Sequence, residues 1–197
     1  QIKKFKMIIG LTGRIAAGKE TLTEFLRKKG FVYLETSKML AEELVKRGLE
    51  PSRWNMQNLG DEIRGRDGVG GLMKMLLKKT EPGKNYIFDS LRNAGEAEFL
   101  RNNVKDFFLI SVDAPQKLRF QRILKRGKLS DPKTWEDFLK VDNRDFFDET
   151  NPMGQQVGKC IEVADFKIIN DSDLGKSMNE INEVWEKIKK KSDKGLM

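Results

Sequence analysis

Short apolar runs alternate along the chain with longer segments in which apolar residues recur at helical spacing. The short runs predict strands at 7–11, 31–34, 86–89, 107–112 and 166–169. The amphipathic segments predict helices at 19–29, 37–47, 53–64, 69–79, 94–101, 115–126 and 176–189. Strands that alternate with helices are typical of a parallel sheet covered on both faces, so the predicted fold class is α/β.

A glycine-framed loop follows the first predicted strand. It reads Gly13, Arg14, Ile15, Ala16, Ala17, Gly18 and Lys19. Glycines let the backbone curl so that N–H groups point inward, and the following helix adds its free N–H groups and positive dipole end. Lys19 supplies a mobile positive charge for terminal phosphates. The pattern predicts a loop that binds ATP phosphates; the alternative is an ordinary strand-to-helix turn with a surface lysine.

The residue after the lysine departs from the usual loop. Glu20 stands where Ser or Thr is usual, and the first hydroxyl comes at Thr21. A carboxylate beside phosphates repels them unless it turns outward or meets the metal ion. We therefore expect Mg²⁺ to be held largely through waters, with Thr21 and Asp89 as its candidate protein partners.

Composition excludes several classes of site. The chain has 197 residues, which suits one domain, and it has no histidine. Cys160 is the single cysteine, so a disulfide framework, His/Cys zinc sites and triads that need an imidazole are excluded. No apolar run is long enough to cross a bilayer, and the start of the chain is not a secretory signal, so we expect a cytoplasmic protein without a membrane partner.

The net charge of +8 lies mostly at the two ends of the chain. Lysines gather before the first strand, where 1–6 reads as an extension, and in a lysine-rich tail at 190–197. The stretch between is nearly balanced, which argues against a nucleic-acid partner. No strong exposed apolar stripe stands out, so the sequence leaves monomer and homodimer open.

Asp89 ends the third predicted strand, where a nucleotide-binding sheet places a carboxylate that orients magnesium-bound water or phosphate. Asp113, which ends the next strand, is a rival for this role, and Asp89 at a helix entry is the structural alternative. Arg92 follows three residues after Asp89 and adds a second phosphate-facing group, which favours Asp89.

A stripe of arginines recurs at Arg119, Arg122 and Arg126 on one helical segment. Arg122 and Arg126 are candidates to neutralise transition-state charge, although such a stripe is often only solvated. Arg144 is a further candidate for substrate binding; its aspartate neighbours suggest a local salt-bridge network equally well.

Acceptor-binding candidates follow the second predicted strand. Glu35 is placed to orient a hydroxyl or phosphate, because ligands gather at the carboxyl ends of parallel strands. Ser37 joins it or caps the next helix. Arg64 is a candidate contact to an acceptor phosphate.

Taken together, these residues resemble P-loop nucleotide kinases, most closely the dephospho-CoA kinase and nucleoside-monophosphate kinase group. This group includes the kinase-like domains attached to some deoxycytidylate deaminases. The likeness covers 7 to about 189 and rests on the loop, on Asp89 with Arg92, and on the segments around 112–115 and 164–170.

The resemblance implies five parallel strands in the order 2-3-1-4-5, helices on both faces, and a helical lid that closes over two nucleotides. It implies that Lys19 and Thr21 hold donor phosphates and that Arg92 is the acceptor-side arginine. It also implies that Arg122 and Arg126 flank the lid and that Asn170 lies near the donor base.

The same resemblance implies one kinase domain at 1–189. Its acceptor-binding helical insert would lie at about 37–79 and its lid at about 127–158; the alternative is two surface insertions without a catalytic role. The expected function is transfer of the ATP γ-phosphoryl group to a small phosphorylated acceptor, first among them a nucleoside or deoxynucleoside monophosphate. Alternatives are a dephospho-CoA kinase-like enzyme and a nucleotide-binding regulatory module without turnover.

Two departures bear on these alternatives. Dephospho-CoA kinases usually carry Asp-x-Asp after the second strand, where this chain has Glu35 and Ser37. The missing second carboxylate argues against dephospho-CoA as acceptor. The absence of histidine removes the deaminase signature, so no base deamination is expected.

Overall fold

The computed structural model describes residues 7–127, 131–147, 149, 151, 153–171 and 173–194, apart from the side chains of 53, 54, 174, 193 and 194. It contains a five-stranded parallel sheet in the order β2-β3-β1-β4-β5, which confirms the strand order that the resemblance implied. The strands are β1 Met7–Thr12, β2 Val32–Glu35, β3 Asn85–Asp89, β4 Phe107–Asp113 and β5 Phe166–Ile169.

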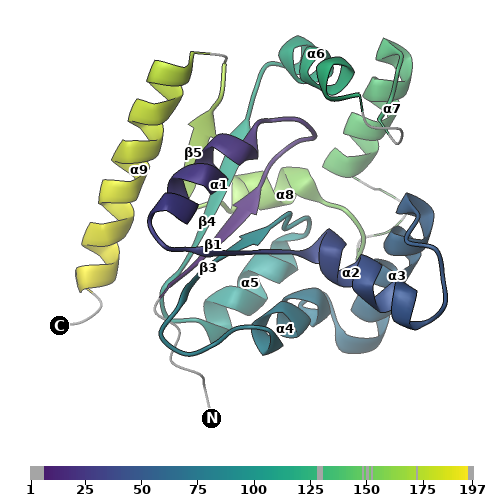
Figure 1. Ribbon diagram of the computed structural model, residues 1–197, viewed down its shortest axis with the longest axis horizontal. Helices are drawn as coiled ribbons and strands as arrows, with labels where there is room; N and C mark the ends of the chain where they lie inside the picture. The colour runs from purple at the N-terminus through teal and green to yellow at the C-terminus, as the bar shows by residue number, and fades with distance from the viewer. Residues whose placement is uncertain are drawn as a thin grey trace.

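Helices cover both faces of this sheet, as predicted (Figure 1). The helices are α1 Lys19–Lys28, α2 Thr36–Lys46, α3 Arg53–Asp67, α4 Gly71–Lys78, α5 Ala94–Asn103, α6 Gln116–Arg126, α7 Trp135–Phe146, α8 Val157–Glu162 and α9 Leu174–Lys194. Because successive strand residues point to opposite faces, Ile8 packs against α2 to α5 while Ile9 packs against α1 and α9. Two apolar layers therefore hold the strand ends in place.

The segment before β5 contains α7 and α8, which the sequence did not predict individually. Thr134 caps α7 by accepting a hydrogen bond from the Asp137 N–H. Trp135 and Phe138 on α7 lie with ring centroids 5.3 and 5.4 Å from Phe120 on α6. This aromatic contact docks α7 beside α6, at the carboxyl ends of the strands (Figure 1).

The chain ends differ partly from expectation. Helix α9 runs to Lys194, beyond the predicted end at 189, while residues 1–6 and 195–197 lie outside the described residues. Cys160 is buried and has no disulfide partner. Among the described residues, no helix is both long and apolar enough to span a membrane.

Candidate functional site

The loop between β1 and α1 has a backbone that requires glycine at both ends. Gly13 has φ +142°, and a Cβ there would lie 2.0 Å from the Val112 carbonyl oxygen. Gly18 has φ +87°, and a Cβ there would lie 2.2 Å from Nδ2 of Asn170. Ala16 also has positive φ, +56°. The glycine spacing seen in the sequence is therefore a steric requirement of this turn.

The inner side of this loop has backbone donors available. Within the described part of the chain, the N–H groups of Ile15, Ala16 and Gly18 have no acceptor, whereas the Ala17 N–H donates to the Arg14 carbonyl. Unpaired N–H groups at a helix N-terminus form a binding site for anions. The loop thus fits the phosphates of a nucleotide.

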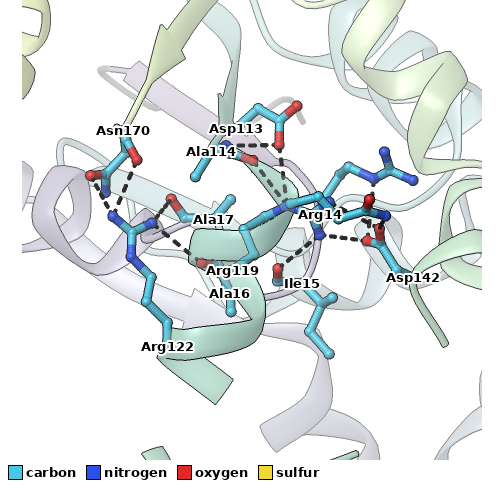
Figure 2. A network of polar contacts seen from close by, with 11 residues as sticks. Arg14, Ile15, Ala16, Ala17, Asp113, Ala114, Arg119, Arg122, Asp142 and Asn170 are labelled. Atoms are coloured by element: carbon cyan, nitrogen blue, oxygen red, sulfur yellow. Dashed lines mark hydrogen bonds and ion pairs between the residues drawn. The ribbon is translucent and has the colours of Figure 1, made fainter. Parts of the chain in front are cut away.

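The outer side of the loop is held by two arginines of α6 (Figure 2). Arg119 donates to the Ile15 carbonyl at 3.3 Å, and Arg122 donates to the carbonyls of Ala16 and Ala17 at 3.4 and 3.1 Å. With its carbonyls bonded on the outside, the loop keeps its N–H groups directed inward.

Asn170 closes the loop from the end of β5. Its amide donates to the Gly18 carbonyl at 3.2 Å, and its Oδ1 accepts from Arg122 at 2.9 Å. Burial lowers the pKa of Arg122 from its usual value. Both side chains thus contact the loop from behind and do not line the cavity described next.

A cavity of about 660 Å³ opens over the loop. It gathers most of the sequence-predicted site residues at the carboxyl ends of β1, β2 and β3. The predicted residues that line it are Gly13, Ile15, Ala16, Ala17, Gly18, Lys19, Glu20, Glu35, Ser37, Arg64, Asp89, Arg92, Arg126 and Arg144. Arg14, Thr21, Arg122 and Asn170 do not line it. Thr21 therefore has no place in the cavity wall, which leaves Asp89 as the predicted metal partner that faces it.

Three arginines of the cavity are paired with carboxylates. Arg64 lies 3.0 Å from Glu96, and both are buried, with 6% and 1% of their surfaces exposed. Arg92 lies 3.5 Å from Asp145 and donates to the Gln155 side chain at 2.7 Å.

Arg126 belongs to the same group. It lies 2.7 Å from Asp131, and hydrogen bonding to that carboxylate raises the pKa of Arg126. By contrast, Lys19 and Arg144 have no ion-pair partner among the described residues. These two cations are available to a ligand.

Asp89 is fixed by two hydrogen bonds that the sequence did not indicate. Tyr33 donates to its Oδ2 at 2.7 Å, and the Ser90 N–H donates to its Oδ1 at 2.6 Å. Burial and the nearby Asp89 charge raise the pKa of Tyr33, so its hydroxyl stays protonated. The sequence offered one signal for the contact between Tyr33 and Asp89. Strand periodicity places Tyr33 on the same face of β2 as Glu35, and Glu35 lies opposite Asp89 in the β2–β3 register.

Glu35 and Ser37 face the cavity together, but Ser37 does not cap the helix. Helix α2 begins at Thr36 with Glu35 in the N-cap position, and the Ser37 hydroxyl donates to the Glu35 carboxylate. The capping alternative for Ser37 is therefore wrong, because the helix starts one residue earlier. Among the described residues, no three Asp, Glu or Cys side chains gather as a metal site.

Comparison with known proteins identifies the family. The model of a family described as an AAA domain matches residues 9–144. A UPF0200 protein of Sulfurisphaera tokodaii is 33% identical, and the match covers 92% of this chain and 97% of that protein. A UPF0200 protein of Thermococcus gammatolerans is 29% identical, with 92% and 95% covered.

Solved structures agree on the fold. TT1252 from Thermus thermophilus matches with a TM-score of 0.59 at 20% identity, covering 93% of this chain and 98% of that one. A shikimate kinase from Acinetobacter baumannii in complex with shikimate matches with a TM-score of 0.55 at 16% identity, covering 96% of each chain. At these identities the likeness concerns the fold, which is that of P-loop kinases. The chain belongs to the UPF0200 family and carries an AAA domain over residues 9–144.

Proposed function

We propose that this protein transfers the γ-phosphoryl group of ATP to a small molecule bound in the same cavity. One observation carries the proposal: the phosphate-binding side of the loop, with Lys19, opens into the cavity that also contains Glu35, Asp89 and Arg144. A donor site and groups able to handle an acceptor thus share one cavity. Such a reaction needs alignment and charge neutralisation more than a strong base, which suits a chain without histidine.

In the proposed mechanism the loop N–H groups bind the β- and γ-phosphate oxygens. Lys19 neutralises charge that develops on the leaving β-phosphate, and Arg144 approaches the γ-phosphoryl group from α7. When bound, Mg²⁺ would offset the negative charge of the donor phosphates. Asp89, already oriented by Tyr33, is suited to accept hydrogen bonds from waters around that ion. Helices α2 to α4 form the proposed acceptor-binding insert, and 127–158 the proposed lid.

The acceptor has two candidate classes. The resemblance implies a nucleoside or deoxynucleoside monophosphate. The charge pattern favours a hydroxyl acceptor, because Arg64 and Arg92 are already compensated by carboxylates while Glu35 faces the cavity. In that reaction the acceptor oxygen bonds to the γ-phosphorus, the bond from phosphorus to the β–γ bridging oxygen breaks, and the acceptor proton passes to Glu35.

Magnesium-dependent ADP formation against a panel of acceptors tests the function. The panel contains ribo- and deoxyribonucleoside monophosphates, dephospho-CoA and shikimate, with the Lys19→Ala variant as control. Rapid turnover with one acceptor, lost in the variant, supports the proposal and names the acceptor. Tight ATP binding without acceptor-dependent turnover overturns it in favour of a regulatory module. Glu20 favours that alternative, because it replaces the Ser or Thr that commonly binds magnesium at this position.

Replacing Glu20 by glutamine is expected to strengthen MgATP binding about fivefold. The carboxylate lines the cavity beside Lys19, and one like charge near phosphate in a hydrated site costs about 1 kcal/mol. Titration calorimetry measures the effect. Glu24→Gln, one turn further along α1, is the matched control, with a smaller expected change. Weaker binding of the Glu20 variant would contradict repulsion and identify Glu20 as a magnesium partner.

Replacing Tyr33 by phenylalanine is expected to lower kcat about tenfold while the affinity for MgADP stays unchanged. The change removes one hydrogen bond to the charged Asp89, a loss of about 1.5 kcal/mol, and frees that carboxylate to rotate. Tyr86→Phe is the matched control, because the Tyr86 hydroxyl accepts a bond from the Glu81 N–H and does not line the cavity. Equal kcat values in both variants would rule out this role of Tyr33.

A further inference from the structure

Helix α7 presents buried carboxylates toward the loops at the carboxyl ends of the strands. Asp142 and Asp145 are 1% and 7% exposed and, three residues apart, lie on one face of the helix. Asp142 contacts Arg119 of α6 and Arg14 of the phosphate loop, and Asp145 contacts Arg92 after β3. One face of α7 is thus tied to segments that follow three different strands.

Asp142 is bonded to partners on α6 and on the phosphate loop (Figure 2). Its Oδ1 lies 2.6 Å from Nη1 of Arg119 and 3.2 Å from Nε of Arg14. Its Oδ2 accepts from Nη2 of Arg119 at 2.9 Å and from the Gln116 side chain at 3.2 Å. A bidentate pair of this kind fixes the orientation of the guanidinium as well as its position.

Arg119 transmits this orientation to the phosphate loop. The side chain is 1% exposed, and besides Asp142 it donates to the carbonyls of Ala114 at 3.0 Å and Ile15 at 3.3 Å. Without Asp142, Arg119 keeps a more distant and more exposed carboxylate, Asp113 at 3.7 Å, so its buried charge is less well compensated. It would then turn toward water and release the Ile15 carbonyl, which removes one constraint on the curled backbone.

Arg14 makes the second link between the loop and α7. Its guanidinium lies 4.2 Å from the centre of the Phe146 ring, one turn beyond Asp142. The loop and α7 therefore share a charge contact and a cation–π contact. Between these two contact points, α7 carries Arg144, which is exposed and lines the reaction cavity.

We propose that Asp142 is a positioning residue. Through Arg119 and Arg14 it holds the phosphate loop in its anion-binding shape, and it holds α7 so that Arg144 is presented to the bound phosphates. The proposal rests on the proposed function only in requiring that the loop binds a nucleotide. It makes the loop and α7 one mechanical unit, joined by the buried Asp142 carboxylate and by the contact of Arg14 with Phe146.

The experiment measures MgADP and MgATP affinity by titration calorimetry, and the unfolding temperature, on the full chain. The variants are Asp142→Asn and the double variant Arg119→Met with Asp142→Leu. Replacing a buried ion pair by apolar residues of similar volume commonly preserves stability, so the double variant keeps the test valid if the single variant fails to fold. Asp137→Asn, on the exposed side of α7, is the control.

We expect both Asp142 variants to bind MgADP about 10- to 100-fold more weakly, the range for a displaced binding group. The double variant is expected to unfold near the wild-type temperature and still bind weakly, a split that a purely structural role would not produce. Arg144→Ala is expected to weaken MgATP binding in the wild-type background and to add nothing in the double variant.

Wild-type affinity in the double variant would overturn the proposal, and so would an undiminished effect of Arg144→Ala in that background. Failure of the wild-type chain to bind either nucleotide is a different result, because it contradicts the proposed function itself. The two failures are therefore distinguishable from the wild-type titration alone.

Discussion

Replacing Lys19 by alanine is expected to lower kcat with the best acceptor on the order of 10³-fold. Lys19 lines the cavity at the N-terminus of α1 and has no ion-pair partner among the described residues, so its charge is available to the phosphates. Loss of a preorganised group that stabilises transition-state charge typically costs this much in turnover. Because the loop N–H groups remain, we expect MgADP affinity to fall far less than kcat.

Steady-state ADP formation and calorimetry on the same preparations check this split. Lys28→Ala, in the exposed last turn of the same helix, is the matched control and is expected to behave as wild type. A Lys19 variant that retains more than a tenth of wild-type kcat would contradict the role of Lys19 in the transfer step.

The phosphate loop was predictable because its requirement is local. Gly13 and Gly18 are separated by the spacing that the turn needs, and both have positive φ, a backbone conformation that favours glycine. The continuous apolar run of β1 likewise indicated a strand covered on both faces. Sequence reasoning succeeds where neighbouring residues in the chain determine the structure.

The polar contacts that orient the site were not predictable, because they join residues far apart in the chain. Tyr33 and Asp89 are 56 positions apart, and Arg119 and Ile15 are 104 positions apart. Nothing in the local pattern around Asp142 distinguishes it from its exposed neighbour Asn143. Such pairs are determined by packing of α7 and the strand ends.

The arginine stripe on α6 shows that helical periodicity alone does not predict the role of each residue. The spacing correctly indicated a shared helical side, but Arg126 lines the cavity whereas Arg119 and Arg122 bind loop carbonyls from behind. Helical spacing predicts which residues share one face of a helix, but it does not predict which groups each of them contacts. The structure thus makes Arg122 a support of the loop, and a role in direct charge neutralisation stays a prediction for Arg126.

Replacing Glu35 by glutamine is expected to separate the two acceptor classes. If the acceptor reacts through a hydroxyl, Glu35 receives its proton, and kcat is expected to fall about 10²- to 10⁴-fold. If the acceptor reacts through a phosphate oxygen, no proton needs to be removed, and kcat is expected to fall less than about tenfold. Glu35 is half-buried, lines the cavity and accepts from Ser37, so glutamine retains the shape and removes only the charge.

The measurement is kcat with the acceptor that the panel identifies, together with MgADP affinity, which we expect to be unchanged. Glu43→Gln on the exposed side of α2 is the matched control, because its partner Arg47 lies outside the cavity. A hydroxyl acceptor combined with an unimpaired Glu35 variant would contradict proton transfer to this residue. Asp89 would then be the other candidate to accept the proton, because it lies opposite Glu35 in the β2–β3 register, at the same end of the sheet. Both of its oxygens already accept hydrogen bonds, but each still has a lone pair for an acceptor proton.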